Sequence, residues 1–109
     1  MTDAEARLIL GKWIEDATPL LLFLVIPDFG LSLRANGTIL RIDSEVFVRF
    51  ESPDVKCSFA IGGAQFQYAD SRDTVTLPYT GRPLQLDDTV CALKIAIPRD
   101  LTIILIEPK

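Results

Sequence analysis

The chain has 109 residues, of which 49% are hydrophobic and 24% are charged. This length fits one domain over residues 1–109, and the composition is that of a globular protein and disfavours a disordered one. The net charge of −4 and the lack of any run of three Lys or Arg residues disfavour nucleic acid as a partner. The sequence contains no histidine, which removes the commonest general base and metal ligand.

The N-terminal residues, about 3–16, are predicted to form a helix. Thr2 and Glu5 have the spacing of a capping box, in which each side chain bonds the other residue's backbone amide. Pro19 should end the element, because the residue before a proline avoids helical geometry. An apolar stripe at helical spacing predicts that Trp13 anchors this helix on the core; its members are Ala6, Ile9, Leu10, Trp13 and Ala17.

The next segment is an uninterrupted apolar run, Leu20–Ile26, between Pro19 and Pro27. A helix that crosses a bilayer needs about 20 apolar residues, so this run is too short. A secretion signal needs a positively charged leader, whereas the preceding residues carry more acidic than basic side chains. We therefore expect a buried strand, no membrane association and a cytoplasmic location.

From residue 40 to residue 51, apolar and charged side chains alternate, which predicts one long half-buried strand. Four turn signals then keep the apolar residues on one face: Asn36-Gly37, Ser52–Val55, Gly62-Gly63 and the loop Asp70–Asp73. Together they predict a five-stranded antiparallel meander from about Phe29 to about Tyr79. The expected inward pairs are Leu31–Ile42, Leu33–Leu40, Val46–Ile61, Val48–Phe59, Phe50–Cys57, Phe59–Phe66, Cys57–Tyr68, Tyr68–Val75 and Phe66–Leu77.

Further strands are expected at Leu84–Leu86, Cys91–Ile97 and Leu101–Ile106, with a turn at Pro98–Asp100. The fold class is thus mainly β: an antiparallel meander of seven to eight short strands, forming a small barrel or a two-sheet sandwich, with the N-terminal helix packed on it. The strands at 20–26 and 101–106 are apolar on both faces, so each face needs a cover. The helix can supply one cover, and a partner subunit could supply another.

Little in the sequence indicates catalysis. Cys57 and Cys91 are expected as two buried free thiols, with a disulfide between them as the alternative. The aspartates Asp87-Asp88 and Asp70/Asp73 are candidates for acid–base chemistry, but aspartates in such loops usually stabilise turns. No phosphate-binding, calcium-binding or zinc-binding spacing occurs, so we expect no catalytic residue, no metal and no cofactor.

The charged face of the 40–51 segment carries one large apolar residue, Phe47. The turn pairing places Ala60 beside it, which would leave the ring accessible. Aromatic and arginine side chains are typical anchors of protein interfaces. We therefore predict a partner-binding face formed by Arg41, Phe47 and Arg49; the alternative is that the helix or a loop covers Phe47.

These observations favour a non-catalytic accessory, regulatory or inhibitor-type subunit that acts through protein–protein interaction or self-association, such as a homodimer. A second hypothesis is a small-barrel carrier that holds an apolar small molecule among the inward aromatic residues Phe29, Phe59, Phe66 and Tyr68. An enzyme that uses carboxylates is less favoured, because such chemistry near neutral pH needs strongly shifted pKa values.

Overall fold

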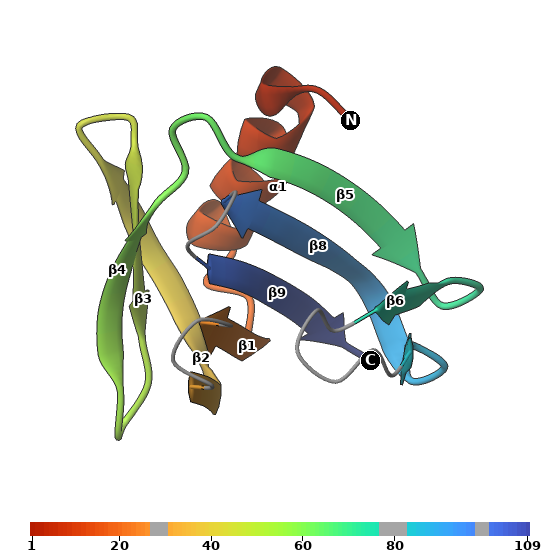
Figure 1. The fold of residues 1–109 in the computed structure, drawn as a ribbon. Coiled ribbons are helices and arrows are strands. Elements are labelled where there is room, and N and C mark those ends of the chain that lie inside the picture. The colour runs from red at the N-terminus through yellow and green to blue at the C-terminus, as the bar shows by residue number, and fades with distance from the viewer. Residues whose placement is uncertain (27–30, 77–82, 98–100) are drawn as a thin grey trace.

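The computed structural model describes residues 1–26, 31–76, 83–97 and 101–109. One helix is followed by nine strands in this part of the chain (Figure 1). All strand pairs are antiparallel, and seven strands form one sheet in the order β4-β3-β2-β1-β9-β8-β5, while β6 and β7 form a separate pair. The elements are α1 (Asp3–Glu15), β1 (Leu20–Ile26), β2 (Leu31–Asp43), β3 (Phe47–Glu51), β4 (Lys56–Ala60), β5 (Gln65–Asp70), β6 (Thr74–Thr76), β7 (Pro83–Gln85), β8 (Thr89–Ile97) and β9 (Leu101–Pro108).

The predicted mainly β fold with one N-terminal helix is confirmed, and the sheet is not closed into a barrel. It is nevertheless strongly curled. Only four residues separate the end of β4 from the start of β5, although these strands lie at opposite edges of the seven-stranded sheet. A flat sheet of that size would measure roughly 29 Å between its edge strands, whereas such a link spans at most about 18 Å. The two edges must therefore approach each other.

Helix α1 lies on the concave side of this curl and packs against β2 and β5 (Figure 1). Its N-terminus has the predicted capping box: the Thr2 side chain accepts from the Glu5 amide, and the Glu5 carboxylate accepts from the Thr2 amide, both at 3.1 Å. The helix ends at Glu15, before Pro19, because Ala17 adopts a left-handed conformation with φ 48°. Trp13 is 2% exposed and anchors the helix on the core, as predicted.

The strands β1 and β9 are apolar on both faces; the fold buries both faces of β9, and it buries the outer face of β1 in part, where Leu21 and Phe23 are half-buried. On the concave side, the helix-side core joins α1 to the inner face of the sheet; its members include Leu10, Trp13, Leu20, Leu22, Val48, Phe50, Leu93 and Leu105. On the other side, β6, β7 and the residue after them cover an outer core formed by Ala69, Val75, Leu86, Ala92, Ile104 and Ile106. These covers come from the chain itself, so the apolar strands do not by themselves require a partner subunit.

The predicted hairpin at Asn36-Gly37 is wrong, because residues 31–43 form one continuous strand. Its first half pairs with β1, where Leu20 lies opposite Gly37, and its second half pairs with β3, where Thr38 lies opposite Glu51. Gly37 is needed for close packing and not for a turn. A Cβ at this position would lie 2.8 Å from the Phe50 ring and would also collide with the carbonyl oxygen of Glu51.

A hairpin occurs instead inside the segment predicted as one long strand. Ser44 and Glu45 have φ values of 51° and 62°, and the Val46 amide donates to the Asp43 carbonyl at 3.1 Å. Positive φ at both central residues is the geometry of a type I′ turn. Upstream of it, a bulge at Leu40 shifts the register of β2 against β3. Leu40, predicted to face inward, is consequently 40% exposed.

The later turns are confirmed only in part. The Ser52–Val55 turn pairs Phe50 with Cys57 and Val48 with Phe59, as predicted. In contrast, the turn around Gly63 does not fold β5 back on β4; β5 crosses to the far edge and pairs with β8, so that Phe66 lies opposite Ile95 and Tyr68 opposite Leu93. Likewise, the turn at Asp70–Asp73 forms, but β6 pairs with β7 and not with β5.

The C-terminal part matches the prediction closely. Strands β8 and β9 form the expected antiparallel pair, with Ile97 opposite Leu101. Other predicted features, namely Phe29, Leu77, Tyr79 and the turn at Pro98–Asp100, lie outside the described residues. In the ranges that the structure describes, no helix has the length and apolar content that a bilayer crossing would need.

Candidate functional site

Strands β2, β3 and β4 form a three-stranded ribbon whose outer face lies opposite α1. The register brings the three predicted binding residues together on this outer face: Arg41 lies directly opposite Arg49, and Phe47 is two residues before Arg49 on the same strand. Two cross-strand rows result, Asp43–Phe47–Ala60 and Arg41–Arg49–Ser58. The structure therefore places Arg41, Phe47 and Arg49 in one patch, which we call the ribbon face.

Phe47 is the most unusual residue of the ribbon face. Its side chain is 46% exposed, and its neighbour Ala60 is too small to shield the ring. The alternative that the helix covers Phe47 is wrong, because α1 packs on the opposite face with Val48 and Phe50. Part of the apolar surface of this ring is therefore exposed to water. Burial of that surface in an interface would be favourable.

The two arginines have acidic neighbours, and Arg41 is the more exposed of the two. Arg41 Nε lies 2.8 Å from Asp43 Oδ1, and Arg49 Nη2 lies 3.6 Å from Glu51 Oε1. Arg49 Nη1 also donates to Ser58 Oγ at 3.4 Å, while its Nε is buried without a hydrogen-bond partner among the described residues. Like charges directly opposite each other disfavour the isolated sheet, so a ligand that brings a carboxylate or carbonyl oxygen would stabilise this pair.

The ribbon also ends in a free edge. Ile61 donates to the Val46 carbonyl and Ser52 donates to the Val55 carbonyl, each at 2.7 Å, which fixes the hydrogen-bonding phase between β3 and β4. In an antiparallel ladder, alternate residues direct both backbone groups to the same neighbour. Cys57 and Phe59 therefore bond to β3, whereas Lys56, Ser58 and Ala60 direct their N–H and C=O groups outward from the sheet.

Of the aspartates considered for catalysis, Asp70 and Asp73 stabilise a turn through their carboxylates. Asp70 accepts from the Arg72 side chain and backbone, and the side-chain hydrogen bond from Arg72 is the main reason that the pKa of Asp70 is lowered to about 2. Asp87 and Asp88 are exposed, and their carbonyl groups accept from Lys109. Among the residues with described positions, no group of three or more His, Cys, Asp or Glu side chains could hold a metal ion.

Both cysteines are free thiols, and they lie on different strands. Burial raises the pKa of Cys57 on β4 and that of Cys91 on β8, and the carboxylate of Glu107 raises the latter further. A raised pKa leaves little thiolate at neutral pH, which disfavours a role of either side chain as a nucleophile. Tyr68, expected inside, is 47% exposed at the edge strand β5.

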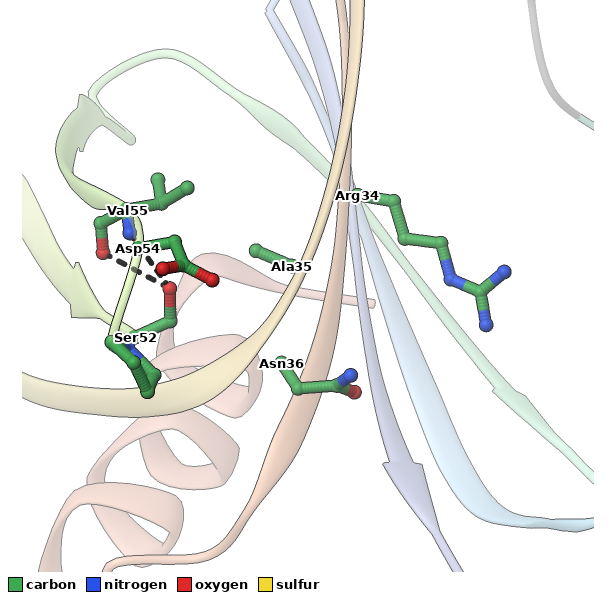
Figure 2. Close-up of a pocket in the computed structure, with 7 residues that line it drawn as sticks. Arg34, Ala35, Asn36, Ser52, Asp54 and Val55 are labelled. Carbon is green, nitrogen blue, oxygen red and sulfur yellow. Dashed lines mark hydrogen bonds between the residues drawn. The ribbon is translucent and has the colours of Figure 1, made fainter.

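A surface hollow lies between β2 and the Ser52–Val55 turn, but its polar groups do not converge. The Ser52 hydroxyl is used within the turn, where it accepts from the Val55 amide at 2.9 Å. Figure 2 shows that Arg34 and Asn36 extend from β2 away from this turn. The Arg34 guanidinium instead lies 5.5 Å from the centre of the Phe23 ring. The ribbon face is thus the better candidate for a binding site.

Sequence reasoning found the residues of the ribbon face and missed the free edge beside it. It missed the edge because the Gly62-Gly63 signal predicted that β5 would pair with β4. No family model, curated protein or solved structure is significantly similar to this chain.

Proposed function

We propose that this protein is a non-catalytic binding subunit, of the accessory, regulatory or inhibitor type, that works in the cytoplasm through its ribbon face. The observation that carries the proposal is the exposed Phe47 ring, which lies between Asp43 and the small Ala60 and beside the row that holds the opposed Arg41 and Arg49. Aromatic and arginine side chains supply much of the binding energy in protein interfaces. No feature of the described residues favours the carrier hypothesis, because Ala6, Leu10 and Trp13 of α1 pack into the concave side of the sheet.

The test compares two substitutions at equally exposed apolar residues. Phe47→Ser removes the proposed anchor, and Val90→Ser changes a residue on β8 that is 49% exposed and distant in the sheet order from the ribbon face. Tagged variants are used to recover stoichiometric partners from the source lysate, and sedimentation velocity reports self-association. We expect association in the wild type and in Val90→Ser, with loss in Phe47→Ser.

Two results would overturn the proposal. One is association that Phe47→Ser leaves unchanged, which would place the interface elsewhere. The other is a wild-type protein that remains monomeric at every concentration and recovers no stoichiometric partner. Circular dichroism of each variant confirms that the fold is retained, so that loss of association reports on the surface.

A further inference from the structure

The free edge of β4, next to the ribbon face, indicates how a partner can bind there. The outward backbone groups of Lys56, Ser58 and Ala60 have no hydrogen-bond partner among the described residues, so they form a row of donors and acceptors that a further extended strand can pair with. At the opposite edge of the sheet, both backbone groups of Asp70, the last residue of β5, bond to Asp73 at 2.9 and 3.0 Å. Figure 1 shows β4 at the outer margin of the molecule, where a strand can approach.

We propose that the occupant is a second copy of this chain, whose β4 pairs antiparallel with β4 about a two-fold axis at Ser58. This inference rests on the proposed function and names its partner. The hydrogen bonds fit such a pairing, because every second residue of β4 directs its N–H and C=O groups outward. Ser58 then lies opposite the partner's Ser58, and Lys56 lies opposite the partner's Ala60, so that all outward backbone groups of β4 find partners.

The side chains are complementary in the same register. No two like charges lie directly opposite each other on the paired strands, because the charged residue Lys56 meets an alanine. Phe47, Ala60 and the partner's Lys56 form one continuous row across the dimer. Phe47 and that lysine stand roughly 10 Å apart at Cα, and Ala60 between them leaves room for the ammonium group to reach the ring face. This contact with the partner's lysine would explain why Phe47 is exposed beside a small residue.

The pairing is isologous and therefore closes on itself as a dimer. Addition of one five-residue strand to another makes a small interface, so the complex is a weak and transient one. It extends the seven-stranded sheets of two molecules into one. The edge of each β4 is used once, which prevents further growth at this site.

The first experiment is sedimentation equilibrium over a wide concentration range with a proline variant. Ser58→Pro removes an outward N–H that has no partner in the part of the chain that the structure describes, and proline is tolerated at such edge positions. Ser58→Ala is the matched control, because it keeps the N–H and removes only the hydroxyl. We expect the dissociation constant to rise about tenfold or more in Ser58→Pro, through loss of two hydrogen bonds across the axis, and to stay close to that of the wild type in Ser58→Ala.

The second experiment tests the register by oxidation, with Cys57→Ser as the background. A Ser58→Cys thiol would face its copy at about 5.5 Å between Cα atoms, within the range of a disulfide. A Lys56→Cys thiol would lie about 14 Å from its copy, because the two are offset by four residues. Rapid covalent dimer formation by Ser58→Cys and not by Lys56→Cys supports the proposal, whereas the reverse preference overturns the register.

The outcomes separate this inference from the proposed function. A wild-type monomer that binds a different protein through Phe47 would refute self-pairing and leave the proposed function standing. A dimer that tolerates Ser58→Pro would also refute β4 pairing. Absence of any association would refute both.

Discussion

The indole Nε1 of Trp13 donates a hydrogen bond to Glu107 Oε1 at 3.0 Å, which joins the only described helix to the last strand across 94 positions of sequence. The indole is buried, so its N–H has no alternative in water. Substitution Glu107→Ala leaves this donor unpaired and should lower the free energy of unfolding by about 1–3 kcal/mol.

Urea denaturation monitored by circular dichroism measures this loss. Glu15→Ala is the control, because it removes an exposed glutamate from the same helix and should change stability by less than about 0.5 kcal/mol. Equal effects of the two substitutions would show that the hydrogen bond does not stabilise the fold.

Gly37 should tolerate no side chain. A Cβ there meets the backbone of Glu51, which cannot move without disrupting the pairing of β2 with β3. We expect Gly37→Ala to destabilise the protein by about 3 kcal/mol. Gly11→Ala provides the contrast, since a Cβ at that helical position meets nothing within 4 Å and alanine favours helix; it should stabilise by about 0.5–1 kcal/mol. If Gly37→Ala were neutral, β2 would not follow the described path.

The turn at Ser44 and Glu45 uses residues that are poorly suited to its geometry. Both have positive φ, which asparagine and glycine adopt at lower cost. The double substitution Ser44→Asn, Glu45→Gly should therefore raise the free energy of unfolding by about 1–2 kcal/mol. Asp54→Gly is the control in the next turn, where φ is not positive, and should destabilise slightly. A loss of stability in the double variant would contradict the hairpin at this position.

The end of α1 offers a second test of backbone strain. Thr18 donates to the Trp13 carbonyl and Ala17 to the Ile14 carbonyl, which is the Schellman pattern with alanine at the position that glycine prefers. Ala17→Gly should stabilise the protein by about 1 kcal/mol, whereas Ala4→Gly in the first turn should destabilise it by about 0.5–1 kcal/mol. The opposite signs are measured by thermal unfolding, and a shared sign would refute the left-handed conformation.

These results explain which parts of the fold were predictable from sequence. The helix, its capping box and the run at 20–26 were predictable because local chemistry determines them. In residues 31–51, the hairpin was predicted where the structure has a continuous strand, and a continuous strand was predicted where the structure has the hairpin. The reason is that both arrangements give the same alternation of inward and outward residues. A two-residue turn at Asn36-Gly37 and a bulge at Leu40 both shift the inward face by one residue, so alternation cannot distinguish them. Across the loop between Asp43 and Phe47, the inward residues keep the same alternation. The sequence pattern of this hairpin is therefore the same as that of one continuous strand.

The pairing of distant strands could not be predicted from local signals. Gly62-Gly63 does mark a turn, but nothing nearby reveals that β5 crosses to the far edge of a curled sheet and pairs with β8. The positions of Phe47 and Arg49 beside β4 were predictable because they depend on the well-defined Ser52–Val55 turn. Arg41 shares their face because the loop at Ser44 and Glu45 preserves the alternation, although the pairing of Arg41 with Arg49 was not predicted. The free edge of β4 was missed for the same reason that the crossing was missed.

The most direct test of β4 as a docking edge is residue-specific amide hydrogen exchange, measured by NMR at increasing protein concentration. We expect the outward amides of Lys56, Ser58 and Ala60 to exchange rapidly in dilute solution and to become protected as the concentration rises, while Cys57 and Phe59 stay protected throughout. Exchange of the three outward amides at one unprotected rate over the whole concentration range would contradict this expectation.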